Sequence, residues 1–147
     1  MTSQAKNELN QSGRCDCGAI VLHAHGRIVS MFHCSCENCQ RATGAGHSSV
    51  ALFHTEALRV VGATKAFSRP AASGATFTRH FCPECGTTIF AQSSRAPALR
   101  IVPVGIFAGD NAWFKPNQLI FSRSYQNWDL VADHLPWHET YRQEDKA

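Results

Sequence analysis

Apolar and polar residues alternate with a period of two over short runs along most of the chain. In the run 76–81, for example, Phe77, Arg79 and Phe81 share one face, and the residues between them share the other. This period is typical of β-strands, and the glycines and prolines between the runs are typical of turns. The runs predict strands over Ala19–His25, Ile28–His33, His47–Phe53, Ala57–Val61, Thr76–Phe81, Thr87–Ala91, Leu99–Val104 and Gln118–Phe121.

The same pattern shows no long segment with the periodicity of a helix. The stretch Arg41–Gly46 is rich in glycine and predicts a loop. We therefore expect an all-β chain built from hairpins, with its cysteines at the turns. Residues 1–12 are rich in Ser, Asn and Gln and predict a flexible leader, and residues 13–147 suit a single domain.

Composition and charge exclude several classes of function. A hydrophobic content of 44% with 17% charged residues is that of a globular protein. The net charge of +3 is small and no stripe of Lys and Arg is present, so we expect no nucleic-acid partner. No apolar stretch reaches the roughly 20 residues of a membrane span. Met1–Gly13 lacks the apolar core of a signal peptide, so we expect a cytoplasmic protein whose thiols bind metal rather than form disulfides.

All seven cysteines stand in three tight clusters, a distribution that favours metal binding over scattered burial. Thiolates suit zinc, which they bind tetrahedrally at ~2.3 Å. Four thiolates close a structural site, whereas three leave the open position that a catalytic zinc needs. We therefore expect two zinc ions, one in a closed site and one in an open site. The clusters are Cys15 and Cys17, then Cys34, Cys36 and Cys39, then Cys82 and Cys85.

The most specific of these motifs is the knuckle Cys82-Pro83-Glu84-Cys85-Gly86, in which two thiolates grip one metal across a tight turn. Two thiolates do not complete a tetrahedron, and the spacing leaves two partner pairs open. Pairing with Cys36 and Cys39 leaves Cys34 to join the first cluster. Pairing with the first cluster leaves the middle cluster as a local triad, which has a low loop-closure cost and is the arrangement we favour.

These motifs, with their neighbouring residues, resemble the glutathione-dependent formaldehyde-activating enzyme family, which includes proteins similar to centromere protein V. The resemblance extends from about Gly13 to Trp137. It is carried by Gly13-Arg14-Cys15-Asp16-Cys17-Gly18, by His33-Cys34-Ser35-Cys36 with Cys39-Gln40-Arg41-Ala42 after it, by Phe81-Cys82-Pro83-Glu84-Cys85-Gly86, and by the late segment Asp133-His134-Leu135-Pro136.

The resemblance implies a β-tent, a set of small antiparallel sheets organised around zinc. It implies carbon–sulfur lyase chemistry in which glutathione and formaldehyde give S-hydroxymethylglutathione. It also implies a division of the ligands between two metals: a structural zinc on Cys15, Cys17, Cys82 and Cys85, and a catalytic zinc on Cys34, Cys36 and Cys39.

A zinc with three thiolates and one open position is suited to a small-molecule thiol, because it lowers the thiol pKa from near 8.5 and holds the sulfur as a nucleophile. Attack of this sulfur on an aldehyde carbon gives an alkoxide, which needs a proton. His33, His47 and His80 are the candidates for this acid–base role. Arginine forks match carboxylates, and Arg41 directly follows the open cluster, so we expect Arg41 to contact a glutathione carboxylate; Arg14 and Arg79 flank the structural ligands. The rival interpretation is a non-enzymatic zinc module that binds a ligand or a protein.

Overall fold

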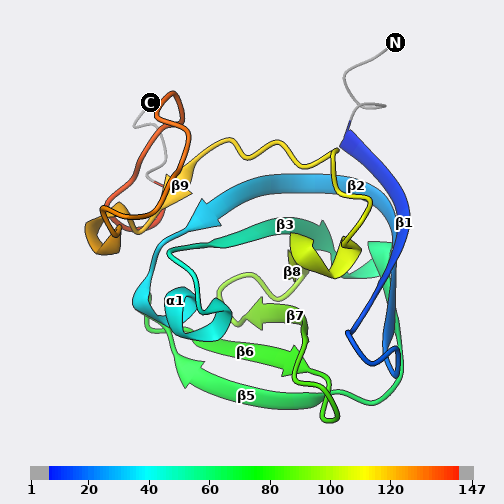
Figure 1. The fold of residues 1–147 in the computed structure, drawn as a ribbon. Coiled ribbons are helices and arrows are strands. Elements are labelled where there is room, and N and C mark those ends of the chain that lie inside the picture. The colour runs from blue at the N-terminus through cyan, green and yellow to red at the C-terminus, as the bar shows by residue number, and fades with distance from the viewer. Residues whose placement is uncertain (1–6, 143–147) are drawn as a thin grey trace.

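The computed structural model describes residues 7–142 (Figure 1). Within this range the fold is mostly β, as the period-two runs predict, with one short α-helix, α1 (Glu37–Thr43). The strands are β1 (Glu8–Arg14), β2 (Val21–Cys34), β3 (Ser48–His54), β4 (Leu58–Val61), β5 (Lys65–Pro70), β6 (Thr76–Phe81), β7 (Thr88–Ser93), β8 (Leu99–Pro103) and β9 (Leu119–Ile120).

The strands form one sheet in the order β1-β2-β3-β8-β7-β6-β5. All neighbours along this path are antiparallel. In Figure 1 the strands from β2 to β5 follow one another from top to bottom, and β1 runs down the right-hand side. Strand β4 adds to the first half of β2, and the short β9 adds to its second half in parallel. Strand β2 therefore has four pairing partners, β1, β3, β4 and β9.

A register shift between Ile28 and Ser30 divides β2 into two halves. The first half pairs with β1 and β4, and the second half pairs with β3 and β9. An irregularity of this kind increases the local twist and redirects a strand. Because β2 changes neighbours at this point, its two ends reach different parts of the molecule.

The core lies between the strands around β2, β3, β7 and β8. Phe53, Leu22 and Ile89 have no exposed surface, and Val102 packs with them. Two cysteines, Cys15 and Cys82, belong to the same buried cluster. The β-rich core therefore extends directly up to one group of thiols.

Three features differ from the sequence-based expectations. The leader expected over residues 1–12 is wrong for Glu8–Ser12, which form most of β1; residues 1–6 lie outside the described residues. The loop expected over Arg41–Gly46 is wrong for Arg41–Thr43, because α1 continues to Thr43 and ends at Gly44. The runs expected over Ala19–His25 and Ile28–His33 join in the single strand β2.

Strand β5 was not expected at all, and it pairs with β6 as the far edge of the sheet. Its sequence, Lys-Ala-Phe-Ser-Arg-Pro, has little apolar content, and most of its residues are exposed. A period-two pattern marks a strand only where one face is buried. Among residues 7–142, no helix is long and apolar enough to cross a membrane.

Candidate metal centres

Two turns distant in the sequence bring four cysteines together at one end of the sheet. Cys15 and Cys17 follow β1 in the turn that leads to β2, and Cys82 and Cys85 lie in the turn between β6 and β7. Their four sulfur atoms all lie within 4.8 Å of one another. The structure thus pairs the knuckle with the first cluster, which is the arrangement that the sequence favours on locality.

The spacing of these sulfur atoms fits a tetrahedral metal. Cys15 Sγ and Cys17 Sγ are 3.7 Å apart, and Cys17 Sγ and Cys82 Sγ are also 3.7 Å apart. A tetrahedral zinc with bonds of ~2.3 Å requires its sulfur ligands to stand about 3.8 Å apart. The same distances are far longer than the ~2.05 Å of a disulfide. The donor set and its spacing therefore fit a closed zinc site.

Neighbouring hydrogen-bond donors stabilise the thiolate form of the cysteines in this four-cysteine group. The Ile20 N–H donates to Cys15 Sγ at 3.2 Å. The Thr87 hydroxyl lies 3.3 Å from Cys85 Sγ and accepts from the Asp16 N–H, which leaves its own proton for the sulfur. This hydroxyl is the main cause that lowers the pKa of Cys85, to about 5. Such outer contacts orient metal ligands and stabilise their anionic form.

Gly86 gives the knuckle its shape. It follows Cys85 with a φ of 80°, which a residue with a Cβ rarely adopts, and its N–H donates to the Cys82 carbonyl at 2.8 Å. Gly18 follows Cys17 with a φ of 81°, and its N–H donates to the Cys15 carbonyl at 3.1 Å. Each turn therefore ends in a glycine with a positive φ, although the first turn is one residue shorter than the knuckle.

The remaining three cysteines meet where β2 passes into α1. Cys34 is the last residue of β2, Cys36 is the N-cap of α1, and Cys39 lies in its first turn. The three sulfur atoms lie within 4.8 Å of one another. The Cys39 N–H donates to Cys36 Sγ at 3.3 Å, so this sulfur performs the capping role that a Ser or Asp oxygen commonly has.

The three thiols differ in acidity. Hydrogen bonds from the Cys34 and Cys39 thiols lower the pKa of Cys36 to about 2, and the positive charge of Arg69 acts in the same direction. The interaction with Cys36 is also the main cause that raises the pKa of Cys34. The hydrogen bonds within the group therefore favour the thiolate form of Cys36 over that of Cys34.

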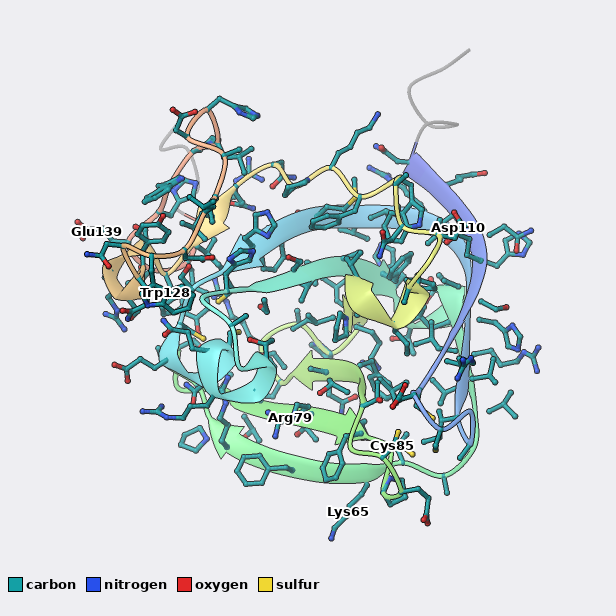
Figure 2. The ribbon with its side chains drawn as sticks, viewed as in Figure 1. Lys65, Arg79, Cys85, Asp110, Trp128 and Glu139 are labelled. Carbon is teal, nitrogen blue, oxygen red and sulfur yellow. The ribbon has the colours of Figure 1, made fainter. Side chains whose placement is uncertain are left out.

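The three-cysteine cluster opens into a cavity of about 870 Å³. Its apolar wall comes from strands β3, β6, β7 and β8, and its polar wall is rich in arginine. The four-cysteine cluster does not line this cavity. Figure 2 shows Cys85 at the end of the sheet away from α1 and Arg79 within the space that the sheet surrounds. The two groups of thiols therefore lie in different surroundings, one at the edge of the core and one on a cavity.

Four arginines line the cavity, and each guanidinium stands over an aromatic ring. Among residues 7–142, none of the four has a carboxylate within 4.0 Å. Cation–π stacking holds a guanidinium in place while leaving its donors free. The pairs are Arg69 over Phe77 at 4.4 Å, Arg79 over Phe67 at 5.8 Å, Arg95 over Tyr141 at 4.7 Å and Arg123 over Phe121 at 5.4 Å.

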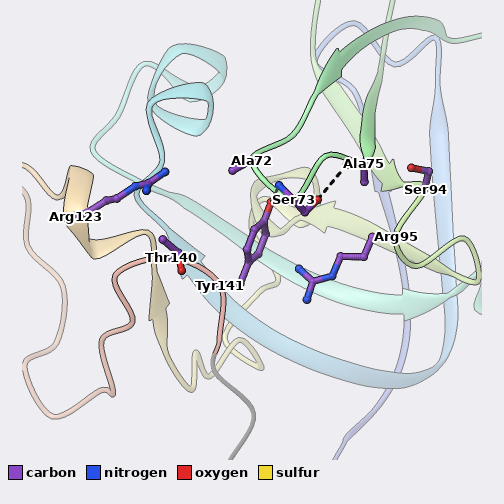
Figure 3. Close-up of a pocket in the computed structure, with 8 residues that line it drawn as sticks. All are labelled: Ala72, Ser73, Ala75, Ser94, Arg95, Arg123, Thr140 and Tyr141. Carbon is purple, nitrogen blue, oxygen red and sulfur yellow. Dashed lines mark hydrogen bonds between the residues drawn. The ribbon is translucent and has the colours of Figure 1, made fainter.

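Two of these arginines, Arg95 and Arg123, stand at an open mouth of the cavity (Figure 3). They approach from opposite sides of Tyr141, whose hydroxyl accepts a hydrogen bond from the Ser73 N–H at 3.3 Å. Arg69 and Arg79 are half-buried farther inside. Positive charge therefore extends from the mouth to the interior of the cavity.

Sequence reasoning placed the carboxylate contact on Arg41, but the structure does not bring Arg41 into the cavity. Its side chain is 74% exposed and lies 3.7 Å from Glu37 on the outer side of α1. Arg14 donates to the carbonyls of Cys15 and Asp16 and does not line the cavity either. Arg79, expected beside the structural ligands, lines the cavity instead, which the knuckle cysteines do not.

Of the three candidate histidines, only His47 lines the cavity. His33 packs edge-on against His47 with ring centroids 4.5 Å apart, and burial is the main cause that lowers the pKa of His33 to about 4. His80 stacks on Phe90 at 4.3 Å, and burial lowers its pKa as well. His33 and His80 are therefore packed as neutral rings, and His47 is the histidine that a ligand in the cavity would meet.

Comparisons with known proteins agree with this architecture. Residues 10–124 match the family described as glutathione-dependent formaldehyde-activating enzyme. No curated protein matches the chain significantly. Among solved structures, the chain is similar to the crystal structure of a Rhodobacter sphaeroides protein determined as a structural genomics target, with 24% identity and a TM-score of 0.54 over 86% of this chain and 99% of that one. At this level of identity the likeness concerns the fold.

Proposed function

Because the chain belongs to the glutathione-dependent formaldehyde-activating enzyme family, we propose that it is a zinc-dependent carbon–sulfur lyase that joins a thiol to a small electrophile such as formaldehyde, or separates the two. The observation that carries this proposal is the three-cysteine cluster opening into a cavity lined by arginines. A thiol needs a place for its sulfur and a pocket for the rest of the molecule, and this arrangement offers both.

Zinc fits each group of thiols in a different way. Cys15, Cys17, Cys82 and Cys85 would complete a tetrahedron by themselves and so hold a structural ion, around which the β-tent is organised. Cys34, Cys36 and Cys39 would hold a second ion and leave one position for a substrate. When bound there, zinc supplies a Lewis acid that lowers the pKa of a thiol and holds the sulfur ready to react.

The arginines favour a thiol that carries carboxylates, and glutathione is the first such thiol to test. Their guanidinium groups lack carboxylate partners in the described part of the chain and line the same cavity as the three cysteines. A guanidinium binds a carboxylate through two parallel hydrogen bonds. The sequence suggested Arg41 for the contact with a glutathione carboxylate. We assign this contact to Arg69 instead, whose positive charge helps to lower the pKa of Cys36.

The test is exchange spectroscopy between free formaldehyde and S-hydroxymethylglutathione, because thiohemiacetals also form without a catalyst and a product assay would mislead. The zinc-loaded protein should accelerate the exchange, and Cys39→Ser should remove the acceleration. If the protein neither accelerates the exchange nor binds glutathione at millimolar concentration, the proposal is wrong for this thiol. A zinc-loaded protein that binds a ligand in the cavity but catalyses nothing would favour the non-enzymatic zinc module.

A further inference from the structure

A histidine–aspartate pair stands at the wall of the same cavity. His47 lies immediately before β3, next to Ser48, which pairs with Cys34 of the three-cysteine cluster. Its Nδ1 lies 2.5 Å from Oδ2 of Asp129, and the two side chains are only 19% and 11% exposed. The residues are 82 positions apart in the sequence, so the pair is made by the tertiary fold.

The surrounding residues hold Asp129 in this position. Its other carboxylate oxygen accepts the Leu130 N–H at 3.0 Å, its own N–H donates to the Gln126 carbonyl at 2.9 Å, and the Tyr125 hydroxyl donates to its carbonyl. A Cβ on the buried Gly46 would lie 2.5 Å from the Asp129 carboxyl carbon. The absence of a side chain at position 46 therefore gives the carboxylate room to reach the imidazole.

The hydrogen bond to Asp129 fixes which ring nitrogen of His47 carries its proton. A carboxylate only accepts, so Nδ1–H is the donor, and Nε2 of the neutral ring keeps its lone pair. In the described part of the chain Nε2 forms no hydrogen bond, and it is not among the buried unpaired polar atoms. A basic nitrogen is thus available to whatever occupies the cavity.

We propose that His47 is the proton-transfer residue of the reaction assigned above and that Asp129 positions it; this inference rests on the proposed function. Nε2 accepts the proton of the substrate thiol, whose sulfur electron pair forms the bond to the carbonyl carbon of the aldehyde. The C=O π pair moves to oxygen, which takes the same proton back from Nε2 as the hydroxyl of the product. The reverse sequence breaks the carbon–sulfur bond, and no other reactant is consumed.

Asp129 lies beyond residues 10–124, the part of the chain that matches the family. The matched residues include His47 but not Asp129, so the pair is inferred from the geometry of this chain and not from the family match. The other two histidines do not compete for the role. Among the residues that line the cavity neither His33 nor His80 occurs, and His33 Nδ1 is engaged by the Ser49 hydroxyl at 3.0 Å.

The decisive variant is His47→Asn. An asparagine side-chain amide can take the place of Nδ1–H and keep the hydrogen bond to Asp129, but it has nothing in the place of Nε2. We expect the acceleration of the glutathione–formaldehyde exchange to fall about 100-fold or more, the range of general acid–base catalysis, while glutathione binding measured by calorimetry stays unchanged. His134→Asn, which removes an exposed imidazole from the same late segment as Asp129, is the matched control and should change neither.

Two further measurements separate catalysis from support of the fold. In ¹⁵N spectra of the unreacted wild-type protein, His47 should be protonated at Nδ1, and Asp129→Asn should shift this tautomer and slow the exchange. Added imidazole should restore part of the activity of His47→Ala. If the wild-type protein accelerates the exchange and His47→Asn retains that acceleration, the role of His47 is overturned and the lyase assignment stands. If the wild-type protein gives no acceleration, both the role of His47 and the lyase assignment are wrong.

Discussion

The role of a charged side chain depends on where the fold places it, and the arginines of this protein show this at the level of single residues. Arg41 stands two residues after Cys39 in the sequence, yet its side chain points to solvent beside Glu37. Arg69 stands 30 residues after Cys39, yet it lines the cavity and contributes to the acidity of Cys36. An exposed ion pair contributes little, whereas a guanidinium held over a ring in a cavity keeps its binding capacity for a ligand.

We therefore predict that Arg69→Gln weakens glutathione binding. Loss of a charge-assisted contact costs about 1.5–3 kcal/mol, so the dissociation constant should rise roughly 10-fold or more. Isothermal titration calorimetry with zinc-loaded protein measures the change directly.

Arg41→Gln provides the matched control, because it removes the same charge from the outer side of α1 and should leave the dissociation constant unchanged. Equal weakening by both substitutions would indicate a general effect of net charge, and weakening by Arg41→Gln alone would return the contact to the residue that the sequence suggested.

At the level of elements, α1 shows how the sequence can hide a short helix. The helix has seven residues, and its N-cap is a cysteine, a residue type that is not among the usual caps. Gly44, with a φ of 72°, ends it as a C-cap glycine, although the same glycine suggested a loop. Its N-cap and its first turn carry two of the three clustered thiols, and the N-cap sulfur accepts the Cys39 N–H as a serine or aspartate oxygen commonly does.

The two groups of thiols support different elements, so we predict that their loss has different effects. Cys85→Ser should remove one ligand from the group that joins the β1–β2 turn to the β6–β7 turn, and zinc binding at a closed site contributes directly to folding. We expect a loss of about 3 kcal/mol or more, or roughly 10 °C in the midpoint of thermal unfolding.

Cys36→Ser should leave the midpoint nearly unchanged, because serine is a good N-cap and can accept the Cys39 N–H in place of sulfur. It should instead abolish thiol binding. Circular dichroism on heating and calorimetry with glutathione measure the two effects. Equal loss of stability in both variants would contradict the division into a structural and a catalytic site.

At the scale of the whole molecule, the sequence predicts features that depend on residues close together in the chain. It misses most features that depend on contacts between distant segments. The knuckle with its glycine, most of the strands and the division into four and three cysteines follow from local spacing. The cavity arginines and the contact of His47 with Asp129 do not, because segments distant in the sequence come together there. Strand β5 does not either, because most of its residues are exposed and show no period-two burial. Resemblance to a family narrows the chemistry but does not place these side chains.

The positions of the two groups of thiols in the molecule also predict how metal is lost. Elemental analysis of zinc-replete protein should give two ions per chain. The three-cysteine cluster opens into the cavity and offers only three thiolates, whereas the other group offers four, of which Cys15 and Cys82 are buried and Cys17 is exposed. The first ion has an open coordination position and should be removed by a chelator in the folded protein. The second is held by four thiolates that join two turns, so its release should be coupled to loss of the fold.

Stepwise addition of a chelator should accordingly remove one zinc with little change in circular dichroism and with loss of glutathione binding. Removal of the second zinc should coincide with loss of the β-sheet signal. The two groups stand at opposite ends of the sheet and share no residue, so their energetic coupling should be small. Release of both ions in one step would contradict the independence of the two sites. A stoichiometry of one ion per chain after zinc is added would contradict the assignment of two metal sites.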